Sequence, residues 1–349
     1  MSTNLHVIGS LETGGVERVI ETLFTLSHYE KHEFQVYGKP NINDIKLPKN
    51  VNITYNYNNI FLFLSNITNR KYDICNFWLH PSIFFSIFFL FRKTRIIWHI
   101  HNSDINIKVL GIRNFVIVTL NSLFSYFIPN NIIFCSKKAI QCHKRFFFSK
   151  KKMQLIYNPI FNKDFKVKKD FKYKNNLKFV MVANYTKAKD FKKLFIILTK
   201  IYKYQFTIDI YGKGIKNNKN LIKLIHKYYL SKCVFLNDFI DTRNLYHKYD
   251  FKFLVSHTES FPVSIFESLF SNTPFICSDV GDVSDIFKNK ILLIPDILDD
   301  SFIQKINELD NIRRNKSKYI KLNKIAQKVV STKFNLDSIL KKYQKLWLN

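Results

Sequence analysis

The stretch Glu259-Ser-Phe-Pro-Val-Ser-Ile-Phe-Glu267 decides the fold class, because two carboxylates flank a segment with the features of a helix start. The apolar run before it, residues 251–256, predicts a strand, and residues 272–281 predict a turn, a short strand and a loop. Strand, helix and strand in this order predict a βαβ unit with its polar groups at one end. Open α/β sheets bind ligands there, outside the carboxyl ends of their strands.

The two glutamates have a defined place relative to the expected helix. Pro262 favours a first helical turn, whose unpaired N–H groups and positive dipole end suit a phosphate. Glu259 lies in the preceding loop and Glu267 more than one turn inside the helix, where carboxylates can accept hydrogen bonds from sugar hydroxyls. The same pattern is equally typical of a helix-flanking acid favoured by the dipole and a solvated helix residue.

Strand and helix patterns alternate along the rest of the chain. In the first half, a helix is expected near residues 16–27 and strands near 5–9, 34–37, 53–55, 72–76, 95–99, 131–136 and 154–158. In the second half, strands are expected at 178–183, 206–211, 234–236, 251–256, 275–278 and 291–294. This alternation predicts an α/β protein with two Rossmann-like domains facing across a cleft.

The expected domain boundaries follow from the same pattern. Residues 1–160 form the first domain and 177–330 the second, while the Lys-rich segment 161–176 has little apolar periodicity and is interpreted as a hinge. Residues 331–349 are expected to form a C-terminal helix that can cross back to the first domain.

The composition of the 349-residue chain allows two domains with cores of their own. Its net charge is +29, and nucleic acid, an anionic membrane surface or an anionic substrate would each suit that charge. The abundance of Lys, Asn, Ile and Phe is equally the mixture that AT-rich coding sequence gives.

Five scattered cysteines form no CxxC pair, so neither a disulfide framework nor a zinc site is expected and a reducing compartment is favoured. The longest apolar run, at residues 83–91, is shorter than the ~18–20 residues of a spanning helix. The chain also starts without a basic leader or an apolar signal core. These features predict a cytoplasmic protein that is not integral to a membrane but can lie against one.

The order of motifs resembles the retaining glycosyltransferases of family 4, which have the GT-B fold. Glu259 and Glu267 match the Glu-x7-Glu signature, and Gly14-Gly-Val-Glu-Arg18 is similar to the family's Gly-Gly-x-Glu-Arg loop. Three further segments resemble family motifs in the right order: residues 155–160, 208–214 and 279–281. The resemblance covers nearly the whole chain.

The resemblance implies roles for individual residues. Glu267 would hold the ribose of a nucleotide, Glu259 the transferred sugar, and Lys189 would neutralise the leaving diphosphate. Further donor contacts would come from the backbone at Gly14 and Gly15 and from the N–H groups of Phe261, Val263 and Ser264.

The chain departs from the family at Asn184, where an Arg is usual. A cation is therefore missing there or supplied from elsewhere, and Lys187 is a candidate substitute. Ordinary solvated loop lysines would explain Lys187 and Lys189 equally well.

Two histidines, His99 and His101, end a strand of the first domain. The resemblance implies a His here that faces the sugar or the acceptor, and His101 is favoured because it lies further into the loop. A satisfied or exposed strand-end histidine is equally typical. His-x-His alone can suggest a metal, but no third ligand is near, so neither metal nor cofactor is expected.

The implied activity is retaining hexosyl transfer from a nucleotide-sugar donor to a glycan or polyprenyl-linked acceptor, in O-antigen, capsule or other surface-polysaccharide synthesis. The mixed aromatic and basic residues 144–152 predict peripheral binding to the anionic inner face of the plasma membrane. A core helix with a solvated basic end explains the same residues.

Two alternatives stay open. One is a non-catalytic GT-B-like sugar-nucleotide-binding or scaffold protein, which Asn184 keeps in view. The other is a basic nucleic-acid-binding protein, which is disfavoured because the lysines are spread along the chain and no reader motif is present.

Overall fold

The computed structural model describes residues 3–12, 14–26, 32–160, 165–169, 171, 176–201, 205–287, 292–294 and 300–348. The chain divides into two compact units, Met1–Ile160 with Leu336–Asn349 (unit 1) and Phe161–Asn335 (unit 2). Most of the segment 161–176, where the sequence predicts a hinge, lies outside the described residues.

Unit 1 is built on a seven-stranded sheet of order β3-β2-β1-β4-β5-β6-β7, in which every neighbouring pair is parallel. Its strands are β1 (Asn4–Ile8), β2 (His32–Val36), β3 (Asn52–Tyr55), β4 (Ile74–Trp78), β5 (Arg95–Ile100), β6 (Asn131–Phe134) and β7 (Met153–Leu155). Parallel neighbours need crossover connections, which is why helices alternate with the strands.

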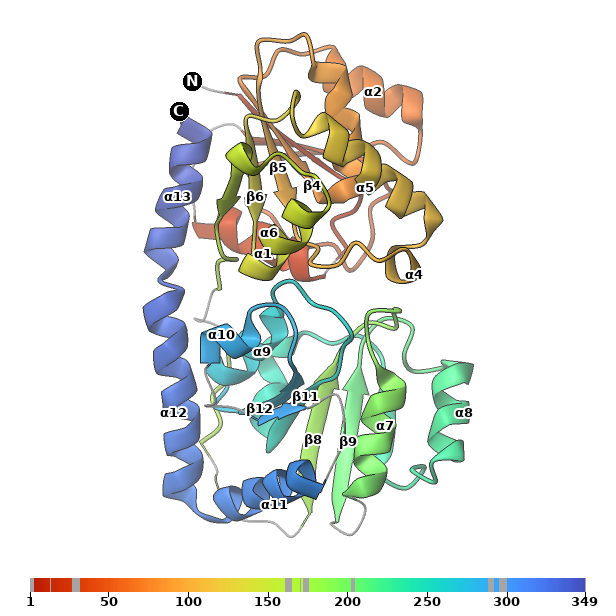
Figure 1. Ribbon diagram of the computed structural model, residues 1–349, viewed down its shortest axis with the longest axis vertical. Helices are drawn as coiled ribbons and strands as arrows, with labels where there is room; N and C mark the ends of the chain where they lie inside the picture. The colour runs from red at the N-terminus through yellow and green to blue at the C-terminus, as the bar shows by residue number, and fades with distance from the viewer. Residues whose placement is uncertain are drawn as a thin grey trace. The chain divides into compact units, whose positions relative to one another are not determined.

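The helices of unit 1 cover both faces of this sheet (Figure 1). They are α1 (Gly15–Leu26), α2 (Ile60–Thr68), α3 (Leu79–Ile83), α4 (Ile107–Leu110), α5 (Ile112–Phe124), α6 (Lys137–Arg145) and α13 (Leu336–Leu348), with the 3-10 turns η1 (Phe84–Phe89) and η2 (Lys150–Lys152).

One face of the unit 1 sheet carries an apolar core, in which Phe77 and Trp98 pack with Phe63 of α2 and Val118 of α5. Such burial of aromatic and branched side chains is the main favourable term in folding.

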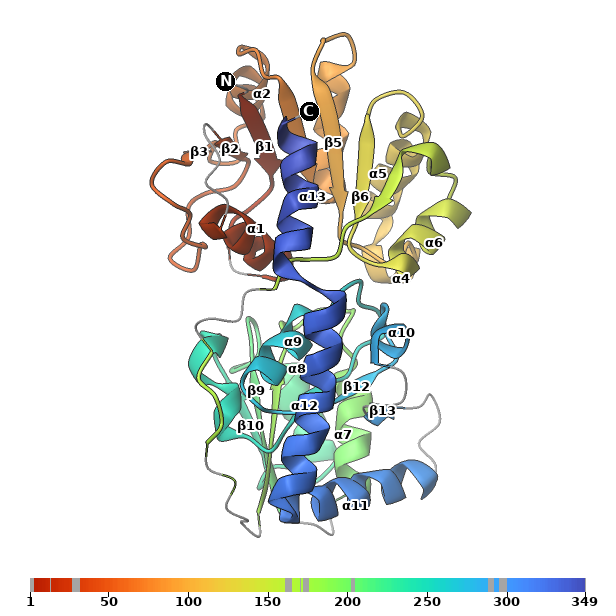
Figure 2. The same ribbon diagram turned by 90° about the vertical axis from the view of Figure 1, so that its left-hand side faces the viewer.

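The opposite face is aromatic and polar, and α13 lies across it near β1 and β5 (Figure 2). Trp347 of α13 donates from Nε1 to Asn76 Oδ1 at 3.0 Å, and His99 Nε2 lies 3.0 Å from the same oxygen. Burial keeps the pKa of His99 well below its usual value, so the imidazole is neutral in this core. Trp347 thus anchors the C-terminal helix on unit 1.

The C-terminal helical segment is divided in two. The sequence predicts a C-terminal helix over residues 331–349, but α12 (Lys316–Lys333) has its C-cap at Phe334 and α13 starts at Leu336. The ring of Phe334 packs edge-on against Phe261 and Phe266 in unit 2. This packing accompanies the break and fixes the end of α12.

Unit 2 has a six-stranded parallel sheet of order β10-β9-β8-β11-β12-β13. Its strands are β8 (Leu177–Val182), β9 (Phe206–Tyr211), β10 (Val234–Asn237), β11 (Phe251–Leu254), β12 (Phe275–Ser278) and β13 (Leu292–Ile294). Its helices are α7 (Phe191–Lys200), α8 (Lys219–Lys227), α9 (Val263–Phe270), α10 (Val283–Phe287), α11 (Asp300–Arg314) and α12, with the 3-10 turns η3 (Thr242–Asn244) and η4 (Tyr246–Lys248).

The central strand β11 separates two environments, because successive side chains point to opposite faces of a sheet. Phe251 and Phe253 join the apolar core with α7. Lys252 lies on the other face of the strand, and α9 contacts β11, β12 and η4. The helix that carries Glu267 therefore packs directly on the central strands.

Candidate functional site

Two loops at the carboxyl ends of β8 and β11 are joined by backbone hydrogen bonds. The amide of Asp190 donates to the carbonyl of Val255 at 3.0 Å, and that of His257 donates to the carbonyl of Ala188 at 2.8 Å. Lys189 and Ser256 form an isolated antiparallel bridge between them. This pairing holds Lys189 next to the loop that carries Glu259.

Glu259 and Lys189 form an ion pair. Glu259 Oε1 accepts from Lys189 Nζ and also from Ser256 Oγ, the latter at 3.0 Å. The side chains of Lys189 and Glu259 are only 16% and 19% exposed. Lys189 is therefore not a solvated loop lysine, and the predicted assignment to the site has a definite partner.

The backbone under Glu259 is fixed by a glycine. Gly281 has φ +57, and a Cβ at this position would lie 2.4 Å from the carbonyl oxygen of Ser260 and 3.1 Å from that of Glu259. Only glycine combines this left-handed conformation with such a close approach. The loop after β12 thus supports the Glu259 loop directly.

Glu267 lies in the middle of α9, which begins immediately after Pro262 as the sequence predicts. Its side chain is buried, and Tyr246 OH donates to its Oε2 at 3.4 Å. The alternative in which Glu267 is a solvated helix residue is therefore wrong. Buried carboxylates are rare unless they are paired, and they mark sites of function or of special structure.

The segment at the start of α9 differs from expectation at one residue. The N–H of Val263 donates to the carbonyl of Phe261 at 2.9 Å, so this predicted phosphate donor is already bonded. A tight three-residue turn at Pro262 causes this. Phe261 is a core residue, stacked on Phe266 with ring centroids 4.7 Å apart. Ser264, half-buried in the first helical turn, stays a predicted donor-binding residue.

Asn184 and Lys187 have different surroundings in the loop after β8. Asn184 Oδ1 accepts from the N–H of Lys213, which holds the turn after β9. A Cβ on Gly212 in that turn would lie 2.1 Å from the carbonyl oxygen of Ala183. Lys187 is exposed, so its role as a substitute cation stays a prediction.

Lys252 is a charged residue near the site that is not among the residues predicted from the sequence. It is fully buried in β11, and its Nζ lies 3.4 Å from the carbonyl oxygen of Phe253. Burial, together with repulsion from Lys189, lowers its pKa to about 7. The signal in the sequence is a lysine inside an apolar run. In the structure this run is β11, a strand paired with β8 and β12 on its two sides, where a lysine is unusual.

The predicted residues of the first half lie in unit 1. His101 follows β5 and stacks on Trp78 with ring centroids 5.9 Å apart, and its buried Nδ1 has no hydrogen-bond partner among the described residues. Burial lowers the pKa of His101 to about 4, which keeps the ring neutral. His99 is entirely buried in the core, so His101 is the better placed of the two to meet a ligand.

The glycine pair starts α1 in unit 1. A Cβ on Gly14 would lie 2.5 Å from Glu17 Oε2, whereas a Cβ on Gly15 would meet nothing within 4 Å. Glu17 Oε2 is the far end of a flexible side chain that can move, so neither glycine is required by its own unit, and the contact that both would make with a donor stays a prediction.

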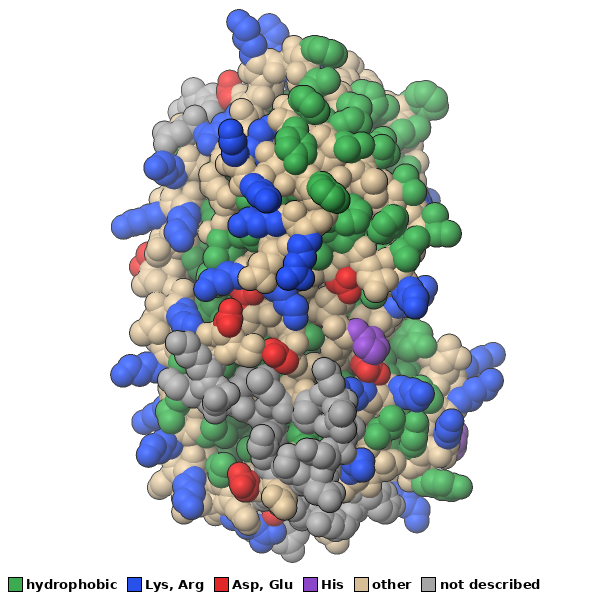
Figure 3. Space-filling model, viewed as in Figure 1, with side chains coloured by type: hydrophobic (Ala, Val, Ile, Leu, Met, Phe, Trp, Pro, Cys, Tyr) green, Lys and Arg blue, Asp and Glu red, His purple; other side chains and the backbone are tan. Residues whose placement is uncertain are grey.

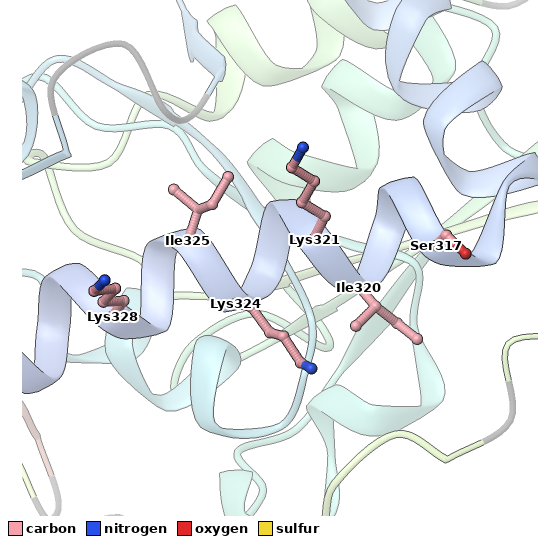
Figure 4. A pocket seen from close by; sticks show the side chains of 6 residues that line it. All are labelled: Ser317, Ile320, Lys321, Lys324, Ile325 and Lys328. Atoms are coloured by element: carbon pink, nitrogen blue, oxygen red, sulfur yellow. The ribbon is translucent and has the colours of Figure 1, made fainter.

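A shallow hollow of about 430 Å³ runs along α12 and is lined by Ser317, Ile320, Lys321, Lys324, Ile325 and Lys328 (Figure 4). It lies on a single helix and contains none of the predicted site residues. Among the described residues, no group of three or more His, Cys, Asp and Glu side chains could hold a metal ion.

Comparison with known proteins supports a glycosyltransferase. Residues 162–328 match the family described as "Glycosyl transferases group 1". The match covers most of unit 2 and a little under half of the chain. No curated protein sequence matches.

Solved structures of similar fold cover nearly the whole chain. HepE of Anabaena, in complex with UDP and glucose, has a TM-score of 0.80 at 15% identity over 99% of each chain. Sucrose-phosphate synthase of Thermosynechococcus elongatus has 0.81 at 14% identity, over 99% of this chain and 98% of that one. The lipopolysaccharide outer core galactosyltransferase WaaB has 0.63 at 17% identity, over 93% and 99%. The predicted α/β class and GT-B fold are thus confirmed.

Proposed function

We propose that this chain is a retaining glycosyltransferase of the family 4 type, which transfers a sugar from a nucleotide-sugar donor bound to unit 2. The single observation that carries the proposal is the pair of shielded carboxylates, Glu259 and Glu267, at the carboxyl ends of the unit 2 strands. The family match over residues 162–328 contains both.

The chemistry of the site suits this reaction. Glu267 accepts from ribose hydroxyls and Glu259 from hydroxyls of the transferred sugar, since carboxylates are strong acceptors. Lys189, held by Glu259, lies where it can offset the charge that develops on the leaving diphosphate.

The proposed transfer exchanges one bond at the anomeric carbon for another on the same face. The bond from this carbon to the diphosphate oxygen breaks, and a bond to the acceptor oxygen forms. The acceptor proton passes to the leaving diphosphate oxygen. No protein side chain needs to act as the general base, and His101 contributes as a neutral group that faces the sugar or the acceptor.

A thermal-shift screen of the purified protein with UDP- and GDP-sugars tests donor binding. A donor at a hundred times its dissociation constant stabilises the folded state by about 2.7 kcal/mol. The melting temperature should therefore rise by several degrees with nucleotide sugars of one base, either uridine or guanosine. ADP-ribose is the control, because its diphosphate is not attached to the anomeric carbon of its terminal sugar. No shift with any nucleotide sugar would contradict the proposal.

We further propose that the acceptor is a glycan or polyprenyl-linked glycan of surface-polysaccharide synthesis, reached at the anionic inner face of the plasma membrane. Hydrophobic side chains gather on the part of unit 1 around α2 and α5, with Lys and Arg side chains alongside (Figure 3). The exposed members include Phe61, Phe88, Phe91, Ile107, Ile112, Val116 and Leu123. None of the described helices is both long and apolar enough to span a bilayer.

The part of unit 1 that follows α2 in the sequence is strongly basic. Between Asp73 and Asp164 the sequence contains a single acidic residue, Asp104. Phe147, 76% exposed, follows α6 at φ +63, a left-handed position at which glycine is preferred. An exposed aromatic retained there, beside Lys144 and Arg145, suits insertion into an anionic bilayer surface.

Replacing Phe147 with Asn is expected to weaken vesicle binding about tenfold, since burying a Phe side chain contributes about 1.5–3 kcal/mol. Asn tolerates the left-handed backbone, so the fold is kept. Tyr229→Asn is the matched control, because Tyr229 is an exposed aromatic at the same position after α8 of unit 2. Co-sedimentation with vesicles of increasing phosphatidylglycerol content measures the effect. Binding that ignores anionic lipid and salt would contradict the membrane proposal.

A further inference from the structure

The charges around the site do not balance without the buried lysine of β11. Lys252 is completely buried, and the charged or titratable groups that act on it are Lys189 from the loop after β8, Cys277 of β12, Glu267 of α9 and Glu259 from the loop after β11. Two carboxylates and Lys189 alone carry one net negative charge. A nucleotide diphosphate bound over them would add more.

Among the described residues, the other polar groups near the two carboxylates are neutral or exposed to solvent. Asn184 is neutral and holds the amide of Lys213, while Lys187 is exposed to solvent. Tyr246 donates a hydrogen bond to Glu267 but carries no charge. Cys277 is buried, and burial raises the pKa of its thiol, so it is neutral as well.

We propose that Lys252 is a positioning residue of the donor site, which takes up a proton when a nucleotide diphosphate binds and so holds Glu267 and Glu259 against an anionic ligand. This inference rests on the proposed donor site in unit 2. Lys252 acts from inside the sheet, through the carboxylates, and need not touch the donor.

The physical basis is the balance between burial and neighbouring charge. Burial disfavours the ammonium form, so the pKa of Lys252 is lowered to about 7, and a large part of the population is neutral near physiological pH. Negative charge brought by a diphosphate favours the ammonium form and raises this pKa. Nucleotide binding is therefore accompanied by proton uptake. Between the pKa of Lys252 in the free protein and its pKa in the complex, the affinity for the nucleotide falls by up to about tenfold for each unit by which the pH rises.

The test is isothermal titration of the full-length protein with UDP, and separately with GDP, at pH 7.5 in buffers of different ionisation enthalpy. The wild type is expected to take up as much as about one proton per bound nucleotide. Lys252→Met, which has similar length and no charge, and Lys252→Arg, which is charged at every pH used, should each lose this uptake. Proton release by the nucleotide itself is common to all three proteins and cancels.

A stability measurement separates this role from a merely structural one. Burial disfavours the ammonium of Lys252 by more than the neighbouring carboxylates favour it, so Lys252→Met should melt at the same temperature as the wild type or higher. The wild type should also gain stability between pH 7 and 10.5, because the unfolded chain binds more protons than the folded one there. Lys252→Met should lack that gain and bind nucleotide at least about fivefold more weakly at pH 6.5.

The outcomes are distinct. Nucleotide binding by the wild type with the same proton uptake in both variants would overturn the role of Lys252 and leave the donor site intact. No binding of either nucleotide to the folded wild type would overturn the donor site and this inference together. Loss of uptake in both variants, with Lys252→Met still folded, would support the proposal.

Discussion

Replacing Glu267 with alanine is expected to reduce donor turnover by about a hundredfold to a thousandfold. The buried carboxylate accepts from Tyr246, and in the proposed site from the ribose hydroxyls as well. Removal of one such charge-assisted contact in a shielded site has effects of this size. The change also leaves Lys252 with one neighbouring carboxylate fewer.

Controls for this prediction come from the same position and from the surface. Glu267→Gln keeps the size and an oxygen that can accept from Tyr246, so it should remain folded while losing the charge. Glu308→Ala removes an exposed carboxylate from α11 and should leave turnover unchanged. Titration with the donor and an assay of nucleotide release measure both steps. Full activity in Glu267→Ala would remove Glu267 from the site.

Gly281→Ala is expected to produce the second large effect, although Gly281 contacts no ligand in the proposed mechanism. The added Cβ would lie 2.4 Å from the carbonyl oxygen of Ser260, so the Glu259 loop has to move. Displacement of a positioned group by about 1 Å costs about a hundredfold in rate. The strained left-handed backbone adds about 1–2 kcal/mol of lost stability.

Gly111→Ala is the matched control, because Gly111 has φ +77 but open space where a Cβ would be. Its φ of 77 and ψ of 159 are essentially restricted to glycine, so it should show at least as much backbone strain as Gly281→Ala and no loss of turnover. Chemical denaturation and steady-state kinetics separate the two effects. If Gly281→Ala and Gly111→Ala have the same turnover, the close contact beneath Glu259 does not affect function.

Most strands could be predicted because each is a short apolar run with turn residues around it. β11 and β12 illustrate this, since Phe251–Leu254 and Phe275–Ser278 both lie inside the expected ranges. β4 is displaced from the expected 72–76 to Ile74–Trp78, because Asp73 is used by the N-terminal segment, where its Oδ2 accepts from the Thr3 amide. Pattern alone does not reveal such a partner seventy residues away.

The end of the chain shows what tertiary packing adds to helical periodicity. The helix expected over residues 331–349 includes residue 334, yet Phe334 is buried against Phe261 and Phe266 and is the C-cap of α12. Trp347 then binds Asn76 in unit 1. Both contacts depend on residues far away in the chain, so local propensity does not contain them.

The site could be predicted only in part for a similar reason. The spacing of Glu259 and Glu267 is visible in the sequence, but the ion pair of Glu259 with Lys189 depends on the backbone bridge between two loops. The sequence gives only a weak signal for Lys252, a lysine among apolar strand residues in a chain with many lysines. Its burial, and the charges around it, appear only when β8, β11, β12 and α9 are assembled.

The most direct test of the account measures nucleoside diphosphate release from a panel of UDP- and GDP-sugars by the wild type, Glu267→Ala and Glu308→Ala side by side. The wild type and Glu308→Ala should release nucleotide from the same donor at equal rates. Glu267→Ala should be slower by about a hundredfold or more. Equal rates for all three proteins, or no donor consumed by folded wild type with lipid and glycan acceptors present, would contradict it.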